Sequence, residues 1–417
     1  MPDRASAARS FPGRGDRKRY RSTEVPKYRR TDVPTYRRTD VPKFGDTVTA
    51  LAPGAPRSYA AGVISDRDLA RWRLHSQRLA APAATAEDVV RTLAAVQAEN
   101  ASQSAWAVAT RTSSPRQGDL ADALTEGRIL RIHVLRSTWH YVHADDALWL
   151  QELTAPRVMP IFEQQLRPIA NRLGMLGDAV ETMLADSPDR TRGDIADALA
   201  ERGEQVTGQQ LMLLLGRLEV QGRICSGAPR DGEHTYARFA DRVPAPRRLD
   251  RDEALAELAL RYFTSHGPAT DRDLAYWATL TVTDVRRGIA AAGDRLASFE
   301  HDGRTFWHAP GEAPASAAPA GHLLQVLDEM YRGYQDSRWV VDADGVVPRA
   351  RETAIGMALV DGQLVAGMKR TVTAKAVAFA VHPHRPLSPR EIRAIQDAAD
   401  RYGEFLGLEA KVRLDGS

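Results

Sequence analysis

Two segments in the middle of the chain show the same order of predicted elements, and this repetition constrains the fold more than any other feature. In the first copy, amphipathic helices are predicted over 191–202 and 208–221, and each is followed by a glycine typical of a helix end. A hairpin then turns at Asp231-Gly232. Short helices followed by a hairpin are typical of a winged-helix module, in which one helix enters the DNA major groove and the hairpin contacts the backbone or the minor groove.

The second copy spans residues 252–309. Helices are predicted over 254–266 and 270–278, a third helix is expected to begin with Thr283 as its cap, and a hairpin turns at Asp302-Gly303. A third copy is predicted within 63–145, with the following elements: helices from Asp66, over Ala86 to about Val96 and over 118–126, strands within 129–142, and a further helix capped by Asp145 and Asp146. Several modules in one chain favour a monomer that encloses DNA, because regulators usually carry one module per protomer and dimerise.

The remaining residues complete a fold class that is mainly α with α+β parts. An Ala/Pro-rich linker over 310–319 precedes predicted strands over 353–360, 363–368 and 376–381 and a final helix over 389–406. We therefore predict five regions: a disordered basic tail over 1–62, winged-helix modules over 63–180, 181–246 and 250–310, and a small β-rich C-terminal domain over 320–417.

Charge is distributed unevenly along the sequence. The formal net charge is +3, but residues 1–44 hold 13 Lys/Arg against 5 Asp/Glu, so the rest of the chain carries −5. DNA binding must therefore be argued from the positions of individual arginines. The sequence has neither a membrane-length apolar run nor a signal peptide. Its single cysteine, Cys225, excludes an internal disulfide framework, and these features predict a cytoplasmic, nucleoid-associated protein.

An eight-residue repeat occupies the N-terminal tail. Its units begin at Tyr20, Tyr28 and Tyr36, and a proline in each unit opposes helix formation. The arginines and tyrosines suit an electrostatic tether that contacts phosphates and stacks on bases. A solvated extension, or an incorrectly chosen start codon, is the alternative interpretation.

Five segments resemble the winged-helix DNA glycosylases of the AlkZ/YcaQ-like superfamily: Thr92–Glu99, Arg131–Val142, Gly267–Trp277, Asp328–Ser337 and Leu359–Gly367. They occur in the right order between about 63 and 410. The resemblance implies tandem winged helices around a concave channel of DNA size, with the C-terminal domain closing one side. It also implies excision of bulky or cross-linked N-alkylated purines, in some members as self-resistance to DNA-alkylating natural products.

The active-site motif of this superfamily is Gln-x-Gln in one branch and Gln-x-Asp in the other. The matching positions here are Gln97 and Glu99, so the amide is kept and the carboxylate is one methylene longer than that of aspartate. Both side chains can serve one site only if the helix ends by about Gln97 and residues 97–99 are extended, since alternate residues of a strand share a face. The alternative is a helix end with Gln97 bonded to the backbone and Glu99 in solvent.

Several cationic residues are candidates for contact with double-stranded DNA. Arg131 and Arg136 are expected to bind phosphate, and His140 to contact phosphate or the damaged base unless its role is structural. Arg286 and Arg287 lie on a predicted recognition helix, although adjacent arginines are more often a solvated face.

Other features carry weaker functional signals. Trp106 is expected in the core rather than as a base-stacking plug, and Asp328, Glu329 and Asp336 resemble a metal site only superficially. No His-x-x-x-His pair, Walker loop or Gly-x-Gly-x-x-Gly fingerprint occurs, so no metal or cofactor is predicted.

The leading hypothesis is a monofunctional DNA glycosylase acting on bulky or cross-linked N-alkylated purines. The alternative is a non-catalytic winged-helix DNA-binding protein, either a transcriptional regulator or a lesion-binding resistance factor.

Overall fold

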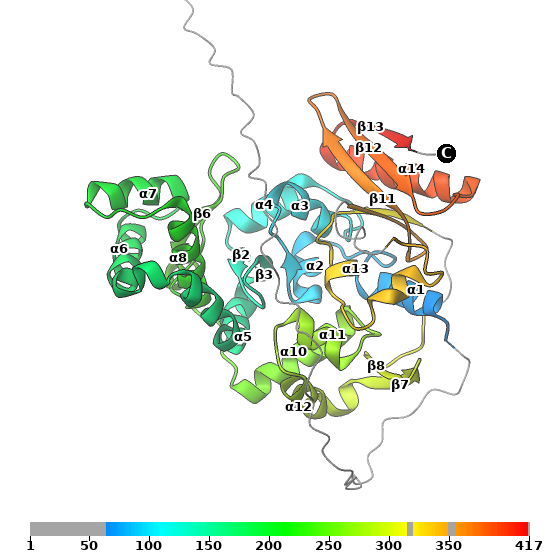
Figure 1. The fold of residues 1–417 in the computed structure, drawn as a ribbon, viewed down its shortest axis with the longest axis horizontal. Helices are drawn as coiled ribbons and strands as arrows, with labels where there is room; N and C mark the ends of the chain where they lie inside the picture. The colour runs from blue at the N-terminus through cyan, green and yellow to red at the C-terminus, as the bar shows by residue number, and fades with distance from the viewer. Residues whose placement is uncertain (1–63, 315–319, 349–355, 416–417) are drawn as a thin grey trace, which may run out of the picture. The chain divides into compact units, whose positions relative to one another are not determined.

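The computed structural model describes residues 64–314, 320–348 and 356–415, and Figure 1 shows the elements within these ranges. The tail predicted over 1–62, with its octapeptide repeat, lies outside the described residues. Within the described ranges, no helix has both the length and the apolar character that a membrane span requires.

The first group of elements, over residues 66–143, contains a three-stranded sheet with the order β1-β3-β2. Its helices and strands are α1 (Asp66–Ser76), α2 (Ala86–Leu93), β1 (Val96–Gln97), α3 (Ala101–Ala109), α4 (Gln117–Thr125), β2 (Ile129–His133) and β3 (Trp139–His143). The prediction that α2 continues to about Val96 is wrong. Ala94 adopts a positive φ of 64°, which ends the helix at Leu93, and Val96 then pairs with Tyr141 in β3.

The second group contains the first predicted copy of the winged-helix pattern. Its elements are α5 (Ala144–Gln165), the 3-10 helix η1 (Arg167–Arg172), α6 (Leu173–Asp186), β4 (Arg190–Thr191), α7 (Arg192–Glu201), α8 (Gly208–Val220), β5 (Ile224–Ser226), β6 (Thr235–Arg238) and α9 (Phe239–Arg242). Thr191 and Thr207 cap α7 and α8 through capping boxes, which fixes the starts of both predicted helices. Asp145 and Asp146 lie inside the first turn of α5, because His143 and not an aspartate is its N-cap.

The third group repeats the pattern. It consists of α10 (Arg251–Ser265), α11 (Asp271–Trp277), α12 (Val282–Ala292), η2 (Gly293–Arg295), β7 (Ala297–His301) and β8 (Arg304–His308). Thr281, not Thr283, caps α12. α10 and α12 approach closely at Gly288, where an added Cβ would lie 2.4 Å from the Leu255 carbonyl oxygen. A side chain at this position would therefore push the two helices apart.

The C-terminal elements form a five-stranded sheet with the order β13-β12-β11-β10-β9. Figure 1 shows β11, β12 and β13 of this sheet beside α14. They are β9 (Gly321–Leu324), α13 (Glu329–Arg332), η3 (Arg338–Asp342), β10 (Gly356–Val360), β11 (Gln363–Val372), β12 (Ala376–Pro383), α14 (Pro389–Leu406) and β13 (Glu409–Leu414). β13 lies parallel to β12, and α14 is the crossover between them. The predicted fold class is confirmed, whereas the five region boundaries stay predictions.

The segment 328–337 connects these groups through buried polar contacts. The Arg111 guanidinium, which follows α3, donates to both carboxylate oxygens of Asp328 at 2.9 and 2.7 Å, and both side chains are fully buried. From α11, one carboxylate oxygen of Asp273 accepts the backbone N–H groups of Gln335, Asp336 and Ser337. The segment is thus held by residues from two groups that are far apart in the sequence.

We expect Arg111→Met to destabilise the protein by about 3–5 kcal/mol, because it leaves the Asp328 carboxylate buried without its partner. The double variant Arg111→Met/Asp328→Leu should recover part of that loss, since no charge then stays unpaired. Urea unfolding measures both effects. Arg248→Ala is the control: its ion pair with Glu152 is exposed and should change the stability by at most about 1 kcal/mol. A single variant as stable as this control would contradict the assigned role of the ion pair.

Candidate active site

Gln97 lies at the end of β1, and both its backbone and its side chain are held by hydrogen bonds. Its backbone N–H donates to Oε1 of Glu329 at 2.9 Å, and its Oε1 accepts from Nη2 of Arg136 at 2.7 Å. Gln97 is only 5% exposed. The alternative in which Gln97 bonds to the backbone at a helix end does not hold, because α2 ends earlier and the amide oxygen bonds to a side chain.

Glu99 follows two residues later and is exposed. The pairing with β3 continues past Gln97, since the N–H of Ala98 donates to the Trp139 carbonyl oxygen at 2.8 Å. The requirement that residues 97–99 be extended is met through Ala98, whereas Glu99 lies in the bend that follows. The Glu99 carboxylate accepts the backbone N–H of Trp139 at 3.2 Å, so its position is set by the neighbouring strand.

Opposite Gln97 on β3 lies His140, a fully buried imidazole. Burial, together with the nearby Arg136 cation, lowers the pKa of His140 to about 3. The ring is therefore neutral at pH 7. Its Nδ1 lies 3.0 Å from the Thr138 carbonyl oxygen, and Nε2 lies 3.3 Å from Nη2 of Arg136. A carbonyl only accepts, so Nδ1 carries the proton and Nε2 accepts from Arg136.

The carboxylate of Glu329 lies behind the Gln97 backbone. It also accepts the indole N–H of Trp277 at 2.9 Å and lies 3.5 Å from Nε2 of His266. Burial alone would raise the pKa of Glu329, but His266 and the Arg136 charge hold that pKa at about 2. The negative charge of Glu329 therefore lies at the Gln97 backbone, and the positive charge of Arg136 lies at the Gln97 side-chain amide.

Two buried polar groups near Gln97 have no hydrogen-bond partner: Nη1 of Arg136 and Oγ1 of Thr138. Such groups are rare in folded proteins, and a bound water, an ion or a functional role usually accounts for them. Arg136 contacts both Gln97 and His140, so its unpartnered Nη1 belongs to the polar cluster around the Gln97 amide.

Arg131 has a positioning role in this geometry. Its Nε donates to the Ala98 carbonyl oxygen at 3.0 Å, Nη2 donates to that of Glu99 at 3.4 Å, and the guanidinium lies 4.2 Å from the centre of the Trp139 ring. The Trp139 indole N–H in turn donates to the buried Glu219 carboxylate of α8 at 3.2 Å. The second group of elements, through α8, therefore supports the backbone of the candidate motif.

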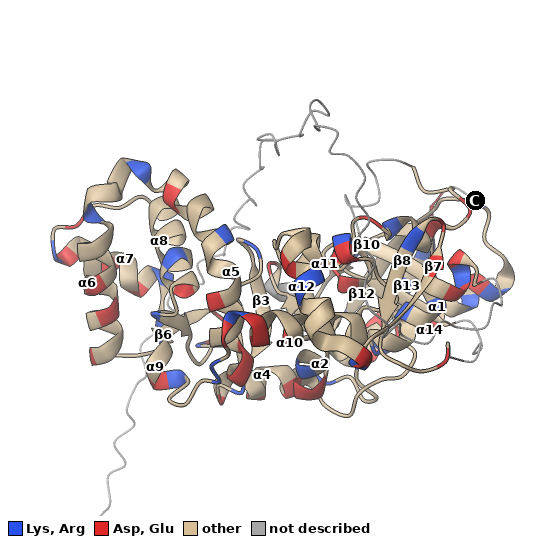
Figure 2. Ribbon diagram, turned by 90° about the horizontal axis from the view of Figure 1, so that it is seen from below, with Lys and Arg blue, Asp and Glu red and all other residues tan. Residues whose placement is uncertain are grey.

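Arg286 and Arg287 lie on α12, away from these contacts. Arg286 pairs with Asp271 at 2.7 Å and Arg287 with Asp252 at 2.6 Å, and both guanidinium groups are largely exposed. Charged residues of both signs lie along α10, α11 and α12 in Figure 2. Contact of Arg131, Arg136, His140, Arg286 or Arg287 with DNA stays a prediction.

The remaining predicted features are accounted for by internal contacts. Trp106 packs in the core against Tyr402 and Phe405, with ring centres 4.4 and 5.3 Å away. Asp336 accepts the Thr270 hydroxyl at 3.1 Å. Among the described residues, no group of three His, Cys, Asp or Glu side chains is arranged to hold a metal ion.

Comparison with known families identifies the fold. The sequence matches the family model described as DNA glycosylase AlkZ-like over residues 90–405. The chain belongs to the AlkZ-like DNA glycosylase family. The resemblance seen in the sequence is thereby confirmed, and the predicted DNA glycosylase activity is the one this family carries.

The structure is also similar to that of the DNA glycosylase AlkZ from Streptomyces sahachiroi. The match has a TM-score of 0.67 at 20% sequence identity and covers 85% of this chain and all of that one. At this identity the likeness supports the fold. A comparison with curated proteins found no significant match.

Two residues of the candidate site were not predicted as part of it. Glu329 lies more than 200 positions from Gln97, and its segment was recognised only as a family resemblance. Thr138 lies between Arg136 and His140 in the sequence, but its unpartnered hydroxyl is a property of packing that sequence spacing does not show.

We expect the folded protein to lose stability as the pH falls from 6.5 toward 3. In the unfolded chain His140 protonates near pH 6.5, whereas in the folded protein it stays neutral down to about 3. The unfolded state therefore binds more protons in this window, and the free energy of unfolding rises with pH until it levels off above 6.5. Urea midpoints between about pH 7 and about pH 4 measure the slope. His140→Gln should make it shallower, and an unchanged slope would contradict this assignment.

Proposed function

We propose that this AlkZ-like protein is a monofunctional glycosylase that hydrolyses the N-glycosidic bond of bulky or cross-linked N-alkylated purines in duplex DNA, with Gln97 and Glu99 as its catalytic residues. The observation that carries the proposal is the pairing with β3 through Ala98, which places the Gln97 amide and, two residues later, the Glu99 carboxylate next to the segment that carries Arg136 and Thr138.

The proposed reaction needs little help with its leaving group. Alkylation at N7 or N3 makes the purine cationic, so when the C1′–N bond breaks its electron pair neutralises the base. Water adds its oxygen to C1′ and loses a proton. A carboxylate stabilises the positive charge that develops on the sugar and accepts this proton, which assigns both tasks to Glu99.

Gln97 is proposed to orient the attacking water. Arg136 occupies one side of its amide oxygen, and the Glu329 contact fixes its backbone, so the amide has a defined direction before substrate binds. Such preorganisation lowers the cost of reaching the reactive geometry. His140 is neutral because its pKa is about 3, so it accepts a hydrogen bond from Arg136 and is not proposed as a general acid.

The proposed partner is alkylated or cross-linked double-stranded DNA, bound by one protein copy in the nucleoid. Arg286 and Arg287 on α12 are proposed to contact phosphates by exchanging their carboxylate partners, Asp271 and Asp252, for the DNA backbone.

The second candidate function, non-catalytic DNA binding, is favoured by one observation. Glu99 is neither the glutamine nor the aspartate of the two family branches. Sequence-preferring binding that Glu99→Ala leaves unchanged, without any base release, would support this alternative.

We expect the purified protein to release N7-alkylguanine from alkylated duplex DNA and Glu99→Ala to lower the rate at least about tenfold, within the range of general-base contributions. Glu99→Asp should retain more activity than Glu99→Ala because it keeps the carboxylate. Mass spectrometry of freed bases measures the rate. Glu163→Ala, at an exposed glutamate of α5, is the matched control and should leave the rate unchanged. Absence of base release from duplexes treated with several alkylators would refute the proposal.

A further inference from the structure

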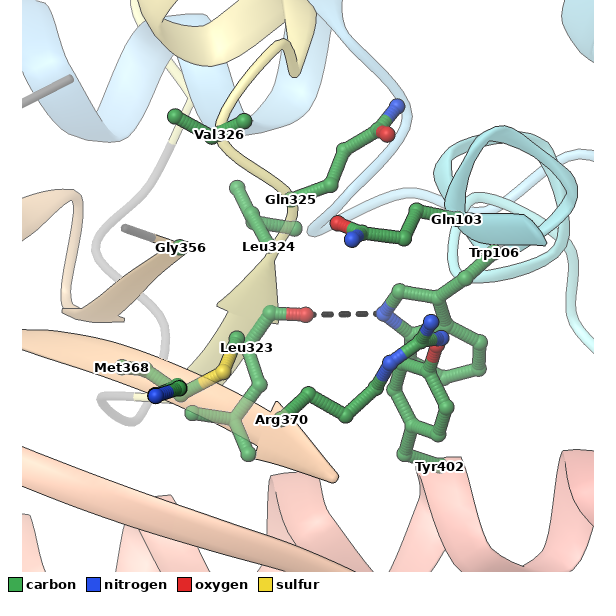
Figure 3. A pocket seen from close by; sticks show the side chains of 11 residues that line it. Gln103, Trp106, Leu323, Leu324, Gln325, Val326, Gly356, Met368, Arg370 and Tyr402 are labelled. Carbon is green, nitrogen blue, oxygen red and sulfur yellow. Dashed lines mark hydrogen bonds between the residues drawn. The ribbon is translucent and has the colours of Figure 1, made fainter. Parts of the chain in front are cut away.

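A cavity of about 380 Å³ lies between α3 and the C-terminal sheet. Its wall combines the amides of Gln103 and Gln325, the cations Lys369 and Arg370, and the apolar surfaces of Trp106 and Met368. Figure 3 shows the Gln103 side chain reaching from α3 toward the β9 side, where Leu324 and Gln325 lie. The volume falls at the lower end of small-molecule sites, which run from about 300 to 1,000 Å³.

Gln325 is the unusual member of this wall. It is 4% exposed, and neither its amide oxygen nor its amide nitrogen has a hydrogen-bond partner. A buried amide without partners is destabilising. Both atoms would be satisfied by a ligand that presents a donor and an acceptor side by side, as the edge of a nucleobase does.

The cavity shares two chain segments with the candidate active site. Gln103 lies in the first turn of α3, which begins directly after Glu99 and Asn100. On the other side, Gln325 precedes Glu329 by four residues, and the Glu329 carboxylate holds the Gln97 backbone. A ligand in the cavity would therefore lie against the segments that carry the motif.

We propose that this cavity binds an N-alkylated purine base that lies outside the duplex. This role rests on the proposed glycosylase function, because the bound base is the one that the reaction removes. For a 7-alkylguanine, the Gln325 oxygen accepts the base N1–H and its nitrogen donates to O6. Hydrogen bonds to this edge and packing between aromatic or apolar side chains are the usual means of reading an unstacked base. Trp106, Met368 and Tyr402 supply the apolar packing for the alkyl group.

The charges of the cavity favour the base after bond cleavage. Lys369 and Arg370 repel the cationic base of an intact N7-alkylated nucleotide but not the neutral base that results when the C1′–N electron pair moves onto the purine. An interaction that improves as the reaction proceeds assists the chemical step, whereas equal binding of substrate and product does not.

Isothermal titration of the full chain with 7-benzylguanine tests the proposal. We expect binding by the parent protein, and binding at least about tenfold weaker for Gln325→Leu, which loses both hydrogen bonds. Its melting temperature should not fall, because an apolar side chain of similar size replaces an unsatisfied amide. If the Gln325 amide had only a structural role, Gln325→Leu would lower the melting temperature and leave the affinity for 7-benzylguanine unchanged. Gln103→Leu is the second variant and should weaken binding in the same sense.

Two controls sharpen the result. Gln209→Leu, at an exposed glutamine of α8, should bind like the parent protein. The 1-methyl derivative of 7-benzylguanine lacks the N1–H and should bind weakly to the parent. Absence of 7-benzylguanine binding by the parent, or equal affinity of parent and Gln325→Leu, would overturn the proposal.

Glu99→Ala separates this proposal from the proposed function. The variant should keep its affinity for 7-benzylguanine, so base binding without any base release would refute glycosylase activity alone. Bound to a duplex that carries 7-benzylguanine, the variant also identifies the source of the base. Loss of free-base binding means that the base of the intact nucleotide fills the cavity; retained binding means that the cavity receives the base after cleavage.

Discussion

The buried carboxylates of Asp328 and Glu329 hold together parts of the chain that are far apart in the sequence. Asp328 neutralises Arg111 behind α3, and Glu329 binds the Gln97 backbone, the Trp277 indole and the His266 ring. Two adjacent carboxylates in an apolar interior are tolerated only when each is paired or hydrogen-bonded. The ion pairs and hydrogen bonds of these two carboxylates thus determine where the candidate motif lies.

Within that framework, the two motif residues have different surroundings. Gln97 is covered and bonded on both sides, whereas Glu99 is exposed and held through the neighbouring strand and by Arg131 at its carbonyl. A fixed amide suits the orientation of a water molecule, and an exposed carboxylate suits contact with a sugar that arrives with the DNA. The extra methylene of Glu99 matters less at an open position than it would in a packed one.

Local patterns were sufficient to predict most of the helices and hairpins. Thr191, Thr207 and Thr270 each cap a helix near its predicted start, and the Asp-Gly turn at Asp302-Gly303 joins two strands as expected. The errors occurred where tertiary contacts compete with propensity. α2 stops at Leu93 because the next residues pair with β3, and β9 and β13 were missed because short or edge strands carry little periodic signal of their own.

The candidate site was predictable only in part for the same reason. Gln97 and Glu99 are neighbours in the sequence, so alternation and the family motif locate them. Glu329, Thr138 and Gln325 matter through contacts, or missing contacts, that exist only after folding. Leaving the buried groups of Arg136, Thr138 and Gln325 without partners costs about 1–3 kcal/mol each. Unpartnered buried groups also occur elsewhere in the described residues, for example at Thr110, Gln151 and His322. Those of Arg136 and Gln325 differ from them in their place, because Arg136 contacts the Gln97 amide and Gln325 lines the cavity beside α3.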